Sequence, residues 1–241
     1  MEVLVAKDYD EMSRLAADVL EEEIRLKPDL VLGLATGSTP IGMYECLARA
    51  HAEHGLDFSQ VKSFNLDEYV GLPPENPQSY HYFMKEHLFS KINIDPANTH
   101  FPTYNEEHPE LSGAQYDEAI VQAGGIDVQI LGIGHNGHIA FNEPDSRLAV
   151  NTGLVELSAS TIEANSRFFE SEDEVPKTAI SSGMGTILKA KNLIILASGA
   201  DKAKAVKQLL DGRYITTEWP VTLTLLHPRV ILVIDEAAAG K

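Results

Sequence analysis

Short apolar runs alternate along the chain with longer segments in which apolar residues recur every three or four positions. Most of the short runs are apolar at every position, which is typical of strands buried on both faces of a parallel sheet. The longer segments have the spacing of amphipathic helices, as Met12, Leu15 and Val19 show in the first of them. We therefore predict strands at 2–6, 30–34, 61–65, 128–132, 192–197 and 230–234, and helices at 8–26, 40–53, 79–88, 111–123 and 200–210.

This alternation predicts an α/β fold, in which helices cover both faces of a mostly parallel central sheet and give three layers. No repeat, linker or shift of composition divides the 241 residues, so we expect one domain over 1–241. The least regular segment is 143–176, which ends in the acidic run 170–174. Its composition fits a flap over a site and a solvated loop equally well.

The charge balance narrows the range of partners. The chain has 19 Lys and Arg against 36 Asp and Glu, a formal net charge of −17. Such a field repels phosphate backbones and anionic membrane surfaces, so we expect neither nucleic acid nor a membrane as partner. A small anionic ligand would need local cations or backbone N–H groups to overcome it.

The cysteine content and the N-terminus indicate the compartment. The single cysteine, Cys46, excludes an intramolecular disulfide and fits a reducing environment. The N-terminus lacks the basic start and long apolar run of a signal peptide, and no apolar run approaches the roughly 20 residues that span a bilayer. We expect a cytoplasmic protein.

Residues 34–40 (LATGSTP) read as a strand end, a turn of small residues and a helix start. Gly37 allows close approach of the backbone, Ser38 and Thr39 supply hydroxyls, and Pro40 suits the first position of a helix. This pattern predicts an anion cradle, with an ordinary helix cap as the alternative. No Gly-Lys-Ser/Thr follows, so the Walker loop is excluded.

Residues 63–69 (SFNLDEY) run from a strand into two adjacent carboxylates, Asp67 and Glu68. Neighbours in an extended chain point to opposite sides, so at most one of the two faces a given pocket. The carboxyl end of a parallel strand is where open α/β sheets bind ligands. Either carboxylate is therefore a candidate catalytic group, and a solvated loop carboxylate is the alternative.

Residues 130–144 (ILGIGHNGHIAFNEP) carry the densest group of polar side chains. Gly132, Gly134 and Gly137 match a dinucleotide fingerprint, but that motif needs a long helix after its last glycine, and Pro144 follows too soon. The alternative is a loop in which His138 acts as an acid and base, with Glu143 near enough to hydrogen-bond to it. A metal site is disfavoured because no third ligand has suitable spacing.

Two positively charged residues are further candidates for binding an anion. Arg167 lies in the segment 165–169, and Lys202 follows a strand and a glycine turn. A lysine in a first helical turn sits at the unfavourable end of the helix dipole, which favours a bound anion there. Arg167 could instead pair with the acidic run that follows it.

Four segments together strongly resemble the glucosamine-6-phosphate deaminase family (glucosamine/galactosamine-6-phosphate isomerases). They are 34–40, 65–72 (NLDEYVGL), 137–144 (GHIAFNEP) and 164–169 (ANSRFF), and they occur in order over nearly the whole chain. The resemblance implies a Rossmann-like fold and conversion of D-glucosamine 6-phosphate to D-fructose 6-phosphate and ammonia, without a cofactor or metal. The related 6-phosphogluconolactonases typically have TASLFP after the histidine, where this chain has IAFNEP.

The resemblance also assigns roles. Asp67 matches the base that moves a proton between C2 and C1, His138 the group that opens the pyranose ring, and Glu143 the carboxylate that orients His138. The phosphate site would be formed by Thr36, Gly37, Ser38, Thr39, Arg167 and Lys202. The segment 157–177 matches a mobile lid that would contribute Arg167.

The chain departs from the family pattern at two places. Asn136 replaces the aspartate that some members carry before this Gly-His, and an amide cannot supply its negative charge, so the imidazolium would depend more on Glu143. Members activated by N-acetylglucosamine 6-phosphate have basic residues where this chain has Gly153 and Val155, and a longer C-terminus. We therefore expect no allosteric activation and a monomer or low-order homo-oligomer. A lactonase and a non-catalytic sugar-phosphate sensor remain the alternative functions.

Overall fold

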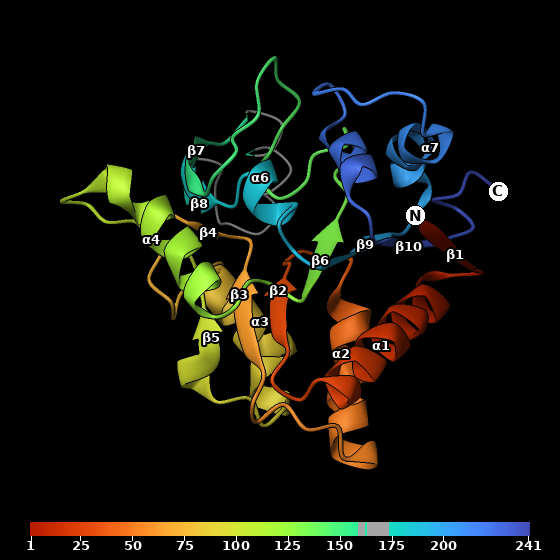
Figure 1. Ribbon diagram of the computed structural model, residues 1–241, viewed down its shortest axis with the longest axis horizontal. Helices are drawn as coiled ribbons and strands as arrows, with labels where there is room; N and C mark the ends of the chain where they lie inside the picture. Colours follow the sequence, from red (N-terminus) through yellow and green to blue (C-terminus); the bar gives the residue numbers. More distant parts are fainter. Residues whose placement is uncertain (159–161, 163–173) are drawn as a thin grey trace.

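A seven-stranded parallel sheet forms the centre of the protein, and its strands are the apolar runs of the sequence (Figure 1). The computed structural model describes residues 1–158, 162 and 174–241. In spatial order the strands are β1 (Glu2–Ala6), β10 (Val230–Asp235), β9 (Asn192–Ala197), β6 (Val128–Gly132), β2 (Val31–Leu34), β3 (Lys62–Asn65) and β5 (Thr99–His100). The six predicted strands are confirmed to within one residue at each end. Only the short edge strand β5 was not predicted.

The predicted helices are confirmed as well. They are α1 (Tyr9–Leu26), α2 (Ile41–His54), α3 (Tyr80–His87), α4 (Pro109–Gln122) and α7 (Ala203–Asp211). The side chain of Asp8 caps α1 and that of Ser79 caps α3, each accepting from a backbone N–H three residues on. The last predicted helix, 200–210, begins as a 3-10 turn, Ala200–Lys202, before α7. The four-residue helix α6 (Met184–Ile187) has no clear sequence signal.

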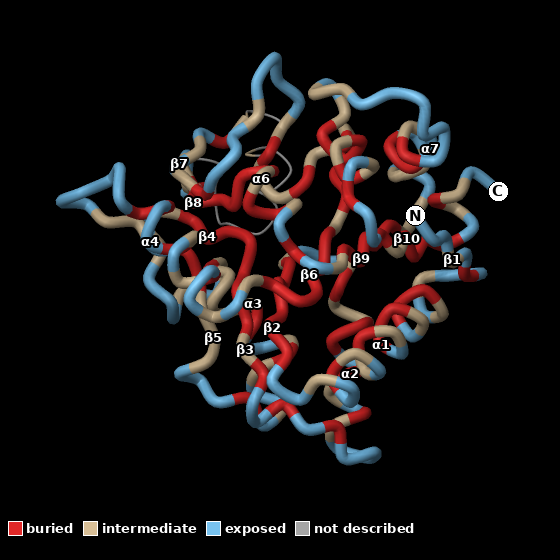
Figure 2. The backbone as a smooth tube through the Cα atoms, viewed as in Figure 1, coloured by how far each residue is buried: buried red, intermediate tan, exposed pale blue. Residues whose placement is uncertain are grey.

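The helices cover the sheet and bury its apolar side chains. Helices α1 and α2 pack against each other on one side, and α1 also contacts β1, β9 and β10. On α4, the ring of Tyr116 packs against Phe64 of β3, with centroids 5.8 Å apart. Figure 2 shows buried backbone along the central strands and exposed backbone in the surrounding loops. The predicted α/β class, with a mostly parallel sheet flanked by helices, is confirmed.

A second, antiparallel sheet was not predicted. It consists of β4 (Asp67–Tyr69), β8 (Thr178–Ser181) and β7 (Gly153–Glu156), in the order β4-β8-β7. The expectation that 143–176 is irregular is therefore wrong for β7. Strands of three or four residues carry too little periodicity to be recognised. In addition, the pairing of β4 with β8 joins residues as far apart in sequence as Asp67 and Ser181.

The sheet topology determines where a ligand can bind. From β2 the chain proceeds outward to β3 and β5, whereas from β6 it proceeds in the other direction to β9 and β10. The loops after β2 and β6 therefore emerge side by side at the carboxyl edge, with the connections leading away from each other. This is the switch point at which open α/β sheets bind ligands. None of the helices in the described ranges is long and apolar enough to cross a membrane.

The opposite edge of the sheet is held by Asp127, whose carboxylate is 7% exposed. It accepts a hydrogen bond from the N–H of Val31 at the start of β2 (2.9 Å), and its oxygens lie 2.6 Å from Lys191 Nζ and 3.0 Å from Lys27 Nζ. Burial alone would raise the pKa of Asp127, but the hydrogen bonds from Lys191, Val31 and Lys27 outweigh it and lower the pKa.

We expect Asp127→Asn to lower the free energy of unfolding at pH 7 by about 2 kcal/mol, because it weakens charge-assisted hydrogen bonds while keeping the side chain's shape. The folded pKa is depressed, so this stabilisation is present above the unfolded pKa of about 3.9 and is lost as the pH falls through the folded pKa. Urea unfolding at pH 7 and near pH 3 measures both effects.

Asp29→Asn is the matched control. Asp29 lies 3.1 Å from the same Lys27, but its side chain is 71% exposed. We expect its loss to cost less than about 0.5 kcal/mol. Equal losses in the two variants, or an Asp127→Asn effect independent of pH, would contradict the assigned role of Asp127.

Candidate active site

Two loops at the carboxyl edge are joined through the end of β8. Asp67 pairs with Ser181 in the antiparallel sheet. The Ser181 hydroxyl accepts a hydrogen bond from the N–H of Phe141 (3.2 Å), and the Ser182 carbonyl accepts one from the Asn142 side chain (2.8 Å). The N–H of Ser182 donates to Leu66 (2.8 Å). The loop after β3 and the loop after β6 are therefore held against one strand.

Tyr80, at the start of α3, links these loops to the loop after β2. Its side chain hydrogen-bonds to those of Thr36 and Tyr69. Its ring stacks on Phe141, with centroids 6.3 Å apart and planes 9° apart. Burial is the main reason why the pKa of Tyr80 lies well above its usual value, and the negative charge of Asp67 adds to the rise. The phenol therefore stays protonated and can donate a hydrogen bond.

Asp67 is the buried carboxylate of the site. It is 7% exposed, and within the described part of the chain no group donates a hydrogen bond to it. Burial raises the pKa of Asp67 to about 8, and the nearby negative charge of Glu68 adds to the rise. A carboxylate with this pKa is a proton acceptor poised near neutral pH.

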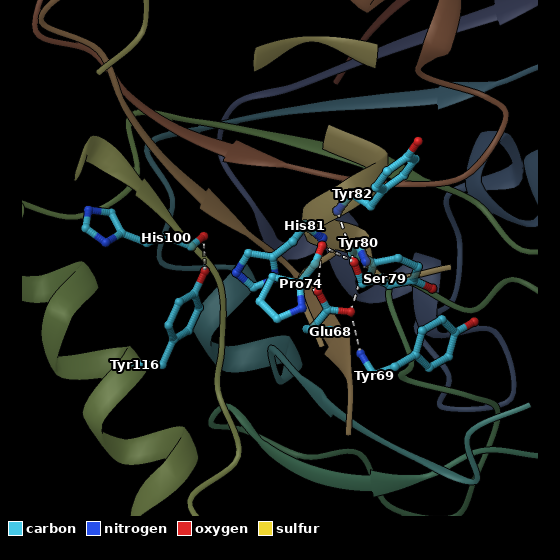
Figure 3. A network of polar contacts seen from close by, with 9 residues as sticks. All are labelled: Glu68, Tyr69, Pro74, Ser79, Tyr80, His81, Tyr82, His100 and Tyr116. Carbon is cyan, nitrogen blue, oxygen red and sulfur yellow. Dashed lines mark hydrogen bonds and ion pairs between the residues drawn. The ribbon is translucent and has the colours of Figure 1, made fainter. Parts of the chain in front are cut away.

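Glu68 has a different environment, which distinguishes it from the adjacent carboxylate of Asp67. One of its oxygens accepts hydrogen bonds from the N–H groups of Tyr69 (2.8 Å) and Tyr80 (2.9 Å). The other accepts from the N–H of His81 (3.0 Å) and lies 2.7 Å from His81 Nδ1. Figure 3 shows the carboxylate turned toward the first turn of α3. Glu68 is thus a structural clamp between β4 and α3, and Asp67 is the candidate for chemistry.

His138 is placed by glycine and by Glu143. A Cβ at Gly134 would lie 2.3 Å from the imidazole, so only glycine leaves room for the ring. His138 Nδ1 is 3.4 Å from Glu143 Oε2 and makes no hydrogen bond of good geometry with any described residue. The same Glu143 oxygen accepts a hydrogen bond from the Asn136 side chain (2.7 Å), and Asn136 Oδ1 accepts one from the His138 N–H (3.2 Å). The predicted His138–Glu143 pair is therefore present, and Asn136 holds the carboxylate in place.

The loop after β2 does not act as an ordinary helix cap. Gly37 has a φ of +93°, and open space lies where its Cβ would be. Pro40 occupies the N-cap rather than the first helical position, and its own side chain makes no capping hydrogen bond. The Tyr9 hydroxyl instead accepts a hydrogen bond from the N–H of Gly42 in the first turn of α2 (2.8 Å). The first turn is thus capped by Tyr9 and not by the hydroxyls of Ser38 and Thr39, which leaves these two hydroxyls available to a ligand.

Of the two cationic residues predicted to bind phosphate, the structure describes Lys202 but not Arg167. Lys202 is at the N-cap of α7, its side chain is 19% exposed, and it lies 3.3 Å from Asp201. The turn before it is fixed by Gly199, whose N–H donates to the buried Asp235 carboxylate at 3.0 Å. Lys202 follows β9, which neighbours β6, so it lies at the carboxyl edge beside the His138 loop. Arg167 and most of the segment 157–177 lie outside the described residues.

The dinucleotide interpretation of the glycines is excluded by the local fold. After Gly137 the chain forms a bridge between Ile139 and Asn142, with Ala140 at a φ of +52°, instead of a helix. Gly137 is needed because Trp219 packs over it, 2.7 Å from where its Cβ would be. In the described ranges no three His, Cys, Asp or Glu side chains are grouped so that they could hold a metal ion.

Several residues of the site carried no sequence signal that we could use. Tyr80 and Ser181 join the loops, Trp219 supports Gly137, and His81 contacts Glu68. Each of them acts through a contact distant in sequence. The glycines were the one available indication, since Gly134 and Gly137 mark close approach of a side chain rather than of a dinucleotide.

Together, the parallel sheet and the titratable groups at its switch point define the class of this protein: an α/β enzyme with a buried carboxylate and a histidine paired with a glutamate. The chain belongs to the glucosamine-6-phosphate isomerase/6-phosphogluconolactonase family, whose profile matches residues 6–232.

Individual relatives narrow the family further. A curated glucosamine-6-phosphate deaminase of Halothermothrix orenii is 56% identical over 100% of this chain and 99% of its own, and that of Clostridioides difficile is 54% identical over 100% and 96%. A solved structure described as a monomeric glucosamine-6-phosphate deaminase superposes with a TM-score of 0.95 at 41% identity, covering 100% of this chain and 99% of that one.

We expect Gly134→Ala to displace the His138 ring, because the added methyl group would occupy its position. The imidazole ¹⁵N resonances of His138 should shift, and its proximity to Glu143 should be lost. Gly132→Ala is the matched control in the same segment, since nothing lies within 4 Å of its Cβ position. Unchanged His138 resonances in Gly134→Ala would contradict this packing.

Proposed function

We propose that the protein converts D-glucosamine 6-phosphate and water to D-fructose 6-phosphate and ammonia. The single observation that carries the proposal is the buried Asp67, which accepts no hydrogen bond within the described residues and has a pKa of about 8. The deaminase relatives, which match this chain over its full length at 50% identity and more, support it independently.

The reaction needs a base that serves two carbons. The hydrogen on C2 of the open-chain aminoaldose must move to C1, and water must then replace nitrogen at C2, with ammonia leaving. Asp67 would take the C2 proton as carboxylate and return it to C1 as carboxylic acid. A pKa near 8 suits both steps, because neither protonation state is too stable to react near neutral pH.

The histidine pair would open the sugar ring. Opening the pyranose requires a proton on the ring oxygen and removal of one from the C1 hydroxyl, a shuttle that an imidazole can perform. Glu143 would stabilise the imidazolium, and the hydrogen bond from Asn136 to Glu143 would keep the carboxylate beside the ring. Asn136 thus positions Glu143 rather than supplying a second charge.

The phosphate would bind at the loop after β2. Thr36, Gly37, Ser38 and Thr39 lie beside the start of α2, where the positive end of the helix dipole favours an anion. Lys202 and Arg167 would add positive charge. These groups supply the local attraction that a substrate needs in a chain with a net charge of −17.

We also propose that the protein is a cytoplasmic monomer without allosteric activation. The full-length similarity to a deaminase described as monomeric supports the oligomeric state. The single cysteine fits a reducing compartment. Gly153 and Val155, in place of basic residues, leave the start of β7 without the charge that a second phosphate site would need.

The proposal is tested by measuring ammonia and fructose 6-phosphate formed from glucosamine 6-phosphate, beside hydrolysis of 6-phosphogluconolactone by the same preparation. We expect activity only in the first assay. Lactone hydrolysis alone would assign the chain to the other branch of its family. Phosphate-ligand binding without either activity would indicate a sensor.

We expect Asp67→Asn to lower kcat for ammonia release by roughly 100-fold or more, since the amide keeps the shape and removes the base. Affinity for a non-reacting substrate analogue should change little. Asp29→Asn, far from the site, is the control for the loss of one carboxylate. A near-normal kcat in Asp67→Asn would overturn the assignment of the base.

The raised pKa also predicts a stability effect. In the unfolded chain Asp67 ionises near 3.9, whereas in the folded chain its pKa is about 8. The folded state binds this proton more tightly, so the free energy of unfolding falls as the pH rises between the two values. Asparagine does not ionise and escapes that loss.

Asp67→Asn should therefore have about the same Tm as the parent near pH 4 and a higher Tm above about pH 8. Thermal unfolding of both chains across this range measures the difference. Parallel curves, with no growing separation, would show that Asp67 is ionised in the folded state at all these pH values.

A further inference from the structure

The side chain of His81 completes the contacts of the Glu68 clamp. Its Nδ1 lies 2.7 Å from Glu68 Oε2. A carboxylate only accepts hydrogen bonds, so this nitrogen carries the proton and donates. The ring is held by stacking on Phe101, with centroids 3.7 Å apart and planes 23° apart. Both the donor and its orientation are thus fixed.

Capping of α3 does not explain this contact. The backbone N–H groups of Tyr80 and His81 already donate to Glu68, and Ser79 accepts from the N–H of Tyr82. The first turn is therefore satisfied without the imidazole, as Figure 3 shows. The ring acts on the carboxylate rather than on the helix.

The imidazole separates the buried carboxylate from a polar cavity. The Glu68 side chain is 8% exposed, whereas that of His81 is 31% exposed. His81 lines a cavity of about 360 Å³ together with Thr99, His100, Gln115 and Tyr116. The ionisable groups that face the cavity from the elements around it are His100 of β5 and Tyr116 of α4. On the side of the His81 ring that faces away from the cavity lie Glu68 and its neighbour in the chain, Asp67.

Glu68 is connected to two groups of the proposed site. Burial raises the pKa of Asp67, and the negative charge of Glu68 raises it further. Among the described carboxylates, Glu68 is the one whose charge has this effect. The Tyr69, Tyr80 and Tyr116 phenols are the other titratable groups that interact with Asp67. The clamp also holds the backbone of Tyr80, whose side chain reaches Thr36.

We infer that His81 is a positioning residue of this site: its Nδ1–H donates a hydrogen bond that stabilises and orients the Glu68 carboxylate, and thereby influences the electrostatic environment of Asp67 and the position of Tyr80. The inference rests on the proposed role of Asp67 as the base. His81 itself does not touch the substrate. Its effect should therefore be seen in the pH dependence of the reaction rather than as an outright loss of activity.

The test compares variants that remove the donor with one that retains it. His81→Phe keeps a ring against Phe101, His81→Leu keeps only bulk, and His81→Asn places an amide donor near the position of Nδ1. His87→Phe, on the same helix and packed against Phe83 at 4.4 Å between centroids, is the control. The pH profile of kcat for ammonia release is measured for each chain.

Removing the donor leaves the charge of Glu68 less compensated, so Asp67 should hold its proton to a higher pH. We expect the acid limb of the profile to move up by about half a pH unit in His81→Phe and His81→Leu. His81→Asn and His87→Phe should keep the parent profile. An unmoved limb in both donor-free variants, even with a lower kcat or Tm, would reduce His81 to a packing role and overturn the inference.

A second readout separates this inference from the proposed function. The ¹³C resonance of the Asp67 carboxyl can be titrated in the parent and in His81→Phe without substrate. A higher midpoint in the variant would support the coupling even if the parent released no ammonia, in which case only the proposed function would fail. Identical midpoints would overturn the coupling whatever the activity.

Discussion

The candidate site depends on the hydrogen bonds that Glu68 accepts from β4 and α3. A carboxylate that receives three backbone N–H groups and one imidazole N–H ties a strand of three residues to the first turn of a helix. The clamp adds to the pairing of β4 with β8. Asp67 precedes Glu68 directly, and Tyr80 is the first residue of α3, so the clamp fixes the proposed base and the tyrosine that reaches the loop after β2.

The two adjacent acidic residues illustrate how one sequence pattern serves two purposes. In a strand, neighbouring side chains point to opposite faces, so Asp67 and Glu68 enter different environments. Glu68 meets the positive end of a helix and a histidine, which compensate its charge. Asp67 is buried beside the negative charge of Glu68, with no hydrogen-bond donor in the described part of the chain, and burial first and that charge second raise its pKa. Local surroundings, not residue type, distinguish base from clamp.

The sequence alone predicted the strands of the central sheet, but it did not predict the contacts that hold the loops at its carboxyl edge together. Strands such as β6 and β9 are continuous apolar runs with clear ends, so their bounds could be predicted to within a residue. Strands β4, β7 and β8 have three or four residues each and form only through pairing across the chain. The resemblance had already assigned the base to Asp67, but the physical difference between Asp67 and Glu68 became visible only with α3 placed in space. Likewise, only the fold shows that Gly134 makes room for His138.

The electrostatics of the site must be local because the chain as a whole repels anions. At a net charge of −17, long-range attraction of a sugar phosphate is absent, and the groups proposed to offset the repulsion are a glycine turn, the start of α2 and Lys202 at the carboxyl edge. Burial serves the chemistry in the same place. Excluding water from Asp67 raises its affinity for a proton and costs stability, whereas at the opposite edge Asp127 binds two lysines and the start of β2. The fold thus places its compensated carboxylate where the strands begin and its uncompensated one where they end, so that stability and reactivity are assigned to opposite edges of one sheet.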